Sequence, residues 1–198
     1  MLFRSGVGNI LGPQQHGHVS AVGFDLYCHL LNEAVSKLKG EDIEIDRTPT
    51  LQLDMDAFIP ETYISDPRQK MDCYKRLAAL TKREELKEIE EELADRYGDP
   101  PYAVKSLFEA VDIRLWALEL GLCEVVSRHS QLVLRYFEDR MPGGAFVSEM
   151  MLRFKDKIRF LPGPPPGLSL STPPGQAGSM LRSMLPQLKH YVKMPARS

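Results

Sequence analysis

Residues 99–137 read DPPYAVKSLFEAVDIRLWALELGLCEVVSRHSQLVLRYF and contain a change from helical to β structure. Asp99 and Pro100 are typical of a helix start, and apolar residues then recur at helical spacing as far as Gly121, which is typical of a helix end. Two β-prone runs follow, so we predict a hairpin over residues 123–137. The side chains expected inside the helix are Val104, Leu107, Phe108, Val111, Leu115 and Leu118.

Two further helices are expected upstream of this stretch. Asp66 can accept hydrogen bonds from the first turn of one of them, and Pro67 suits its first position. Thr81 and Glu84 have the spacing of a capping box for the next helix, which Gly98 would close. With the helix before Gly121, these segments predict a compact helical unit.

Strands are expected on both sides of these helices. Residues 51–57, LQLDMDA, alternate between apolar and polar, as in a strand with one solvated face. Residues 158–161 and 168–171 are shorter candidates, the latter inside the proline-rich segment 162–175, which is otherwise a spacer or an ordered loop. With the hairpin, these strands favour an α+β fold, in which several helices pack on a small mixed or antiparallel sheet.

Helices are also expected outside this central region. Apolar residues recur every four positions across residues 20–40, which end at Gly40, and predict a long connecting helix. Residues 145–155 favour a short helix. A last helix at about 178–192 would be kinked or divided at Pro186.

The charges are unevenly distributed along the 198 residues, although the formal net charge is only −2. From Lys82 to Asp99 eight acidic residues outnumber four basic ones, whereas from Arg153 onward eight basic residues accompany only Asp156. The asymmetry permits an acidic docking surface and a separate basic surface able to touch nucleic acid. Two solvated surfaces without partners are the alternative.

The sequence disfavours several kinds of chemistry. Cys28, Cys73 and Cys123 are odd in number and widely spaced, which argues against a disulfide framework and a Cys-x-x-Cys metal site and fits a reducing cytosol. His16 and His18 lack partners at metal-ligand spacing, and no nucleophile elbow is present. No apolar run approaches the ~20 residues of a membrane span, and there is no signal-peptide core. We therefore expect no catalytic residue, metal or cofactor in this chain.

The clearest motif is EIEEELADRYG at residues 88–98. On a helix, Glu88, Glu92 and Asp95 share one face, opposite the apolar side. Like charges so placed repel each other by roughly a few tenths of a kcal/mol per pair, and Arg96 could offset part of that repulsion. Such a face either needs no partner or is suited to a cationic one.

A glycine-dense loop, GVGNILGPQQHGH, occupies residues 6–18. Neither phosphate-binding pattern fits it, because no Lys-Ser or Lys-Thr follows Gly12 and Leu11 stands where a dinucleotide site needs its third glycine. Composition alone favours a flexible connector.

Three sequence blocks together resemble a known family. Residues 6–27, GVGNILGPQQHGHVSAVGFDLY, resemble the R-G-A-G-N-L-L-G-x-x-Q-S-G…GF-x-LY signature that follows the second motor domain of bacterial transcription-repair coupling factors and, less fully, of RecG-type helicases. Residues 59–80 and 91–101, IPETYISDPRQKMDCYKRLAAL and EELADRYGDPP, resemble the IP-x-x-YI…YKRIA…EL-x-DRFG-x-xP run of the coupling factor's C-terminal domain. The likeness covers about residues 6–122.

The resemblance implies a large cytoplasmic translocase on double-stranded DNA that uses ATP and magnesium, pushes stalled RNA polymerase and recruits excision repair through UvrA. Residues 1–19 would be the remnant of the translocation motif, 20–40 the connecting helix, and 41–198 a C-terminal regulatory domain. In the family this domain clamps onto a UvrB-like N-terminal module and masks its UvrA-binding surface. The ATPase motifs are absent from this chain, so we expect neither ATP hydrolysis nor DNA unwinding from it alone.

The resemblance also assigns roles to single residues. Gln15 matches the glutamine that couples ATP hydrolysis to movement, with Gly8 and Gly12 giving its loop conformational freedom. Glu92, Asp95 and Arg96 match the positions of the clamp onto arginines of the UvrB-like module.

The match is incomplete in two places. Ser5 replaces the family's arginine before G-A-G, and we expect residues 1–5 to be a non-native remnant of truncation or cloning. Beyond about residue 123 the likeness fades, so it assigns no role to the proline-rich segment or the basic tail.

Two other interpretations remain open at this point. The chain could be the end of a RecG-like branch-migrating helicase, although the YKRL and DRYG blocks argue against this. It could also be an unrelated helical protein-interaction domain, which is all that periodicity and capping establish by themselves.

Overall fold

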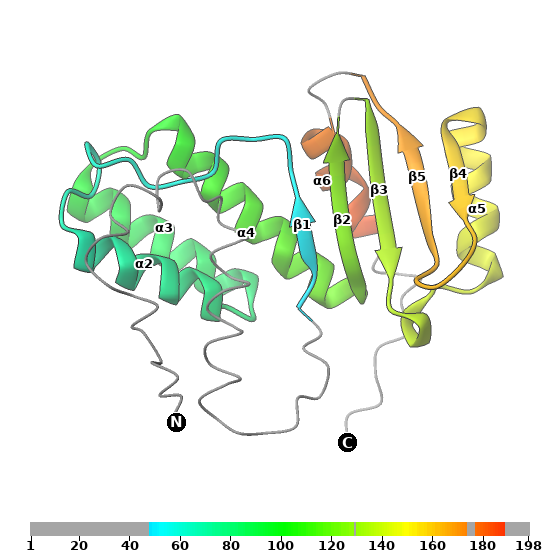
Figure 1. Cartoon of the computed structure of the whole chain (residues 1–198), viewed down its shortest axis with the longest axis horizontal. Helices are drawn as coiled ribbons and strands as arrows, with labels where there is room; N and C mark the ends of the chain where they lie inside the picture. The colour runs from blue at the N-terminus through cyan, green and yellow to red at the C-terminus, as the bar shows by residue number, and fades with distance from the viewer. Residues whose placement is uncertain (1–47, 129, 174–176, 189–198) are drawn as a thin grey trace, which may run out of the picture.

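The computed structural model describes residues 48–128, 130–173 and 177–188 (Figure 1). These residues form an α+β fold, as predicted, with a helical group at one end and a sheet at the other. The elements in chain order are β1 (Thr50–Gln52), α2 (Pro67–Ala79), α3 (Arg83–Tyr97), α4 (Tyr102–Leu120), β2 (Leu122–Arg128), β3 (Gln131–Tyr136), α5 (Gly144–Phe154), β4 (Ile158–Leu161), β5 (Gly167–Ser171) and α6 (Ala177–Leu188), with 3-10 turns at Glu138–Arg140 and Lys155–Lys157.

The sheet has five strands in the order β1-β2-β3-β5-β4. β1 runs parallel to β2, and the other pairs are antiparallel. β2 and β3 form the predicted hairpin, in which Val126 lies opposite Val133. β5 comes from the proline-rich segment and lies between β3 and β4, so this part of the segment belongs to the sheet rather than to a spacer.

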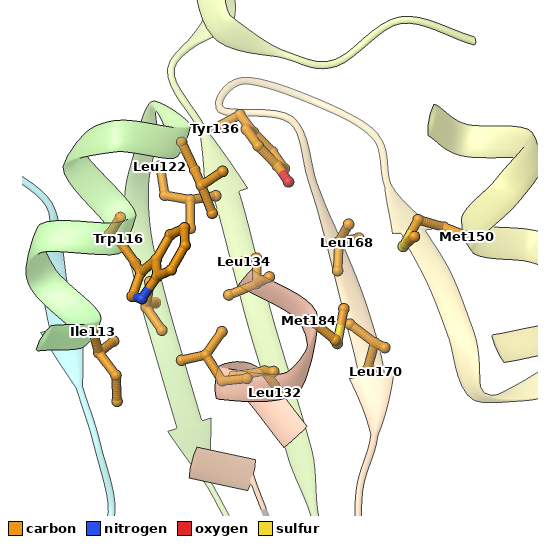
Figure 2. Packing of buried hydrophobic residues seen from close by; sticks show 14 of the residues in the cluster. Ile113, Trp116, Leu122, Leu132, Leu134, Tyr136, Met150, Leu168, Leu170 and Met184 are labelled. Carbon is orange, nitrogen blue, oxygen red and sulfur yellow. The ribbon is translucent and has the colours of Figure 1, made fainter. Parts of the chain in front are cut away.

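Helix α4 lies between two hydrophobic cores. One side of it contributes Ile113, Trp116 and Leu120 to the core that covers the sheet, where Figure 2 shows Trp116 beside the strands, with Met150 from α5 and Met184 from α6 further along the same core. Another side contributes Leu107, Phe108, Val111 and Leu115 to the core shared with α2 and α3. Because twelve of its nineteen residues are buried, α4 joins the helical group to the sheet.

The predicted strand at residues 51–57 is only partly correct, since β1 ends at Gln52. The predicted alternation of burial does hold, because Gln52, Asp54 and Asp56 are exposed and the apolar residues between them are buried or partly buried. Leu53 touches both cores, whereas Met55 and Ala57 pack against the helical one. The chain therefore leaves the sheet after three residues to reach the helices.

Helix α2 begins as predicted, but the predicted start of α3 is wrong. The Asp66 carboxylate accepts a hydrogen bond from the backbone N–H of Arg68 at 2.7 Å. Helix α3 starts after Lys82, which provides no side-chain cap, so Thr81 and Glu84 form no capping box. The first residue of α3, Arg83, instead bonds to Asp112 of α4 at 2.6 Å.

The predicted start of α4 at Asp99 and Pro100 is also wrong. Pro101 is the N-cap residue, and the helix begins at Tyr102. A residue that precedes proline is driven toward extended backbone, so Pro100 is kept out of the helix by Pro101. The predicted stops at Gly98 and Gly121 are confirmed, both with positive φ.

The elements near the C-terminus agree with the predictions to within one residue where they are described. Helix α5 is predicted at 145–155 and β4 at 158–161, close to their bounds in the structure. Helix α6 runs undivided from Ala177 to Leu188. The rest of its predicted range, the connecting helix at 20–40 and the glycine loop lie outside the described residues.

Gly121 should be required at the junction between α4 and the sheet. Its φ is 68°, and a Cβ there would lie 2.6 Å from Cβ of Arg140. We expect Gly121→Ala to lower the free energy of unfolding by about 2 kcal/mol or more, because left-handed backbone strain and a steric clash add together. Gly144→Ala is the control, since its added methyl group would have no neighbour within 4 Å and its φ is not positive. Equal stability of the two variants in chemical denaturation would contradict this.

Candidate docking surface on helix α3

Helix α3 presents one face to the helical core and the opposite face to solvent. Leu86, Ile89 and Leu93 are buried, at the three- and four-residue spacing of one helix side. Glu88, Glu92 and Asp95 lie on the other side, and all three are exposed. We call these three carboxylates the α3 acidic face. The sequence therefore placed the acidic face correctly.

The C-terminal end of α3 is held by tyrosines. The Tyr63 hydroxyl lies 3.1 Å from the carbonyl oxygens of both Leu93 and Gly98, in the last turn of α3 and directly after it. Its ring lies 5.7 Å from that of Tyr97, whose hydroxyl donates to the Gln69 side chain at 2.6 Å. The acidic face is therefore carried on a helix end with fixed tertiary contacts.

Glu92 is already bonded to an arginine of the same chain. The Arg76 guanidinium, from the last turn of α2, donates both Nη atoms to the two carboxylate oxygens of Glu92, with 2.9 Å between Nη1 and Oε1. The side chains remain 40% and 43% exposed. The hydrogen bond from Arg76 lowers the pKa of Glu92 and raises the pKa of Arg76. Glu92 thus shows that this face accepts the two-pronged guanidinium contact typical of arginine.

Asp95 and Arg96 have more open surroundings. Asp95 forms no ion pair with any residue in the described ranges, and Arg96 is exposed. The Arg96 guanidinium carbon lies 5.2 Å from the centre of the Tyr97 ring. Arg96 also lowers the pKa of Glu92, to a smaller extent than Arg76 does. It therefore acts as a minor positive neighbour on the same helix.

Sequence reasoning missed Arg76, Tyr63 and Gln69 as components of this surface. Arg76 and Glu92 are sixteen residues apart and lie on different helices, so helical spacing within one segment gives no signal for their pairing. All three residues fall in the block at residues 59–80. Residues of that block, in α2 and in the loop before α2, form hydrogen bonds to α3.

A groove of about 700 Å³ runs beside α3, between α3, α4 and Arg182 of α6. Its charged groups mostly pair with one another, as Arg83 does with Asp112 and Arg182 does with Glu109 at 3.1 Å. Burial, followed by the nearby Asp112 charge, raises the pKa of Glu90. Because the charges are paired across the groove and do not converge on its centre, this arrangement suits contact between helices rather than catalysis.

The described residues offer no activated thiol and no metal site. Burial raises the pKa of the Cys73 thiol to about 11 and also raises the pKa of Cys123, so both stay protonated near neutral pH. Within the described part of the chain, no group of three or more His, Cys, Asp or Glu residues is placed to hold a metal ion. No helix among those residues is long and apolar enough to cross a membrane. Gln15, Gly8 and Gly12, predicted for motor coupling, lie outside the described ranges.

Comparison with known proteins identifies the region that contains this surface. Residues 53–142, which include all of α2, α3 and α4, match the model of the TRCF domain family. This region is a TRCF domain. The matched residues also include the hairpin, so the family extends beyond the helical group to part of the sheet.

Curated relatives of this TRCF domain are transcription-repair-coupling factors. The chain is 42% identical to that of Bacillus subtilis (strain 168) over 113 residues, covering 57% of this chain and 10% of the relative. It is 34% identical to that of Myxococcus xanthus over 164 residues, covering 79% of this chain and 13% of the relative. The chain thus spans about a tenth of the length of these relatives.

The fold is similar to a solved structure described as the C-terminal domain of transcription-repair coupling factor. The match has a TM-score of 0.58 at 21% identity and covers 72% of this chain and 94% of the other. Our expectation that the sequence likeness fades beyond about residue 123 is wrong, because the family match continues to residue 142 and the Myxococcus xanthus relative aligns over 79% of the chain. The structural match shows that the chain shares the fold of that C-terminal domain.

The Arg76–Glu92 pair of this TRCF domain should be visible in a titration of its carboxylates. Replacing Arg76 with alanine is expected to raise the pKa of Glu92 toward its ordinary value, because the main group that lowers it is removed. The pair therefore stabilises the fold above the unfolded-state pKa of Glu92, and this contribution is lost as the pH falls through the lower folded-state value. NMR titration of side-chain carboxylates measures the shift.

Arg83→Ala is the matched control, because Arg83 pairs with Asp112 rather than Glu92. It should leave the titration of Glu92 unchanged. A Glu92 curve that is the same in wild type and in Arg76→Ala would show that the pair does not form in solution.

Proposed function

We propose that this chain is the regulatory C-terminal region of a translocase that moves on double-stranded DNA and links stalled RNA polymerase to excision repair. Its role is to dock through the α3 acidic face onto arginines of the UvrB-like module of the same parent protein. In that state it masks the surface that UvrA binds. The observation that supports this most directly is the position of Glu88, Glu92 and Asp95 on the solvent side of a helix within the TRCF domain.

The existing Arg76–Glu92 pair is compatible with docking. Exposed ion pairs are worth roughly 0–1 kcal/mol, and both side chains here are about two-fifths exposed. An incoming arginine can therefore share or replace the contact at little cost. Asp95 has no ion-pair partner among the described residues and would be the first contact. The resulting interface should weaken as salt concentration rises.

The motor function belongs in this proposal to the parent protein rather than to this chain. ATP and magnesium would be bound by motor domains, and Gln15, Gly8 and Gly12 would transmit their movement toward the connecting segment. The α3 acidic face would then control when the parent protein recruits UvrA. The chain by itself would therefore bind the module without hydrolysing ATP.

Reversing two charges of the α3 acidic face should weaken docking. We expect Glu92→Lys with Asp95→Lys to reduce affinity for the isolated UvrB-like module by roughly tenfold or more, because charge-assisted contacts are worth about 1.5–3 kcal/mol each. Isothermal titration calorimetry at low salt measures the loss. In the intact parent protein, the same pair of substitutions should increase UvrA binding.

The control changes the same number of charges on other elements of the domain. Glu138→Lys with Glu149→Lys alters two exposed carboxylates, one in the turn after β3 and one on α5, and should bind the module nearly as well as wild type. Thermal unfolding of both double variants verifies that each is folded. Equal affinity of the two double variants would count against docking through Glu92 and Asp95.

A further inference from the structure

A second charged surface lies at the end of the molecule away from α2 and α3 (Figure 1). Where α5 ends and β4 begins, Arg153, Lys155, Lys157 and Arg159 are all exposed. We call these four residues the α5–β4 basic edge. Asp156 is the only acidic residue between them.

The charges of this basic edge are not neutralised within the described structure. None of the four cations forms an ion pair with another described residue, whereas Arg76, Arg83 and Arg182 all do. The Arg153 guanidinium carbon lies 5.7 Å from the ring centre of its neighbour Phe154. A cluster of one sign without counter-charges creates a positive potential that attracts polyanions.

The backbone holds these cations on one outer edge. Burial alternates at the start of β4, where Ile158 is 7% exposed and part of the sheet core while Lys157 and Arg159 are exposed. Lys157 ends the 3-10 turn and Arg159 lies in β4, so the two exposed cations flank a buried residue at the start of this strand. β4 is the last strand of the sheet in the described part of the chain, where no further strand lies beyond it.

We propose that the α5–β4 basic edge binds the phosphodiester backbone of duplex DNA without reading its sequence. Lysine and arginine contacts to phosphate position a protein on DNA but carry no sequence information. Binding to single strands usually adds exposed aromatic rings on which bases stack. Phe154 and Phe160, the aromatic residues of this edge, are both partly buried. The surface therefore fits a duplex better than a single strand.

This contact is separate from docking through α3. The α3 acidic face and the basic edge lie at opposite ends of the molecule, so occupation of one leaves the other accessible. The chain could therefore hold DNA whether or not it also binds the UvrB-like module. The inference rests on the charges and geometry of β4 and α5 alone.

The test measures binding of the purified 198-residue chain to a short fluorescein-labelled duplex by fluorescence anisotropy. Four phosphate contacts predict a slope of about −3.6 for log Kobs against log salt concentration. Lys157→Gln with Arg159→Gln should reduce the magnitude of that slope by about 2 and weaken binding at low salt roughly tenfold or more.

Lys155→Gly removes another cation at a position where φ is 47°. Glycine favours this backbone region, so a loss of binding by this variant cannot be attributed to unfolding.

Arg68→Gln with Lys75→Gln is the matched control, because it removes two exposed cations from α2. It should retain nearly all of the duplex affinity. Equal loss in both double variants would overturn the proposal, as would an absence of duplex binding by the wild-type chain at low salt.

Two further binding measurements distinguish duplex DNA from other anionic partners. Met151 and Leu152 are 55% and 78% exposed on α5 beside the cations, and apolar groups next to basic ones also suit anionic membranes. Stronger binding to phosphatidylserine vesicles than to duplex DNA would contradict the proposal in favour of a lipid surface. Stronger binding to single-stranded DNA of the same length would contradict the preference for a duplex.

Discussion

The burial of α4 on two sides is the constraint on which the rest of the structure depends. A helix that faces solvent on one side needs only one apolar stripe, but α4 supplies Trp116 to the sheet core and Leu107 to the helical core. Arg114 is also buried in this helix and donates hydrogen bonds to the carbonyl oxygens of Leu77 and Leu80, at 3.0 and 2.9 Å. These carbonyls belong to the end of α2, where positive charge is favourable. The helical group is therefore fixed relative to the sheet through one shared helix.

This arrangement determines what the two charged surfaces can do. α3 packs its buried stripe into the core that it shares with α2 and α4, while its carboxylates face solvent. The basic edge of α5 and β4 lies at the other end of the sheet. A rigid body with opposite charges at its two ends can engage two different partners at once, and neither contact requires the fold to change. The TRCF domain match and the solvent-facing carboxylates of α3 together support a docking role.

Local sequence patterns predicted most of the secondary structure, because helix caps and helix ends depend mainly on interactions between neighbouring residues. Asp66 caps its helix and Gly121 ends α4 with positive φ, as expected from an aspartate carboxylate and from a residue without a Cβ. Errors arose where tertiary contacts decided the outcome. β1 is shorter than its alternation suggested, because Met55 and Ala57 pack on the helices. The late start of α4 is instead a local effect, since Pro101 directly follows Pro100 and keeps it out of the helix. For the candidate docking surface, helical spacing placed Glu92 and Asp95 on the solvent side of α3. The pairing of Glu92 with Arg76 depends on how α2 packs on α3 and could not be seen in either segment.

In the proposed docking, the α3 acidic face, on a scaffold fixed by α4, contacts the UvrB-like module. Mapping of NMR chemical shifts on the isotope-labelled chain during titration with that module tests this contact. The largest changes should fall on residues 88–96 and on the Arg76 side chain, while β4 and α5 remain unaffected. Large changes confined to the groove beside α4 or to the sheet, with residues 88–96 unperturbed at saturation, would contradict it.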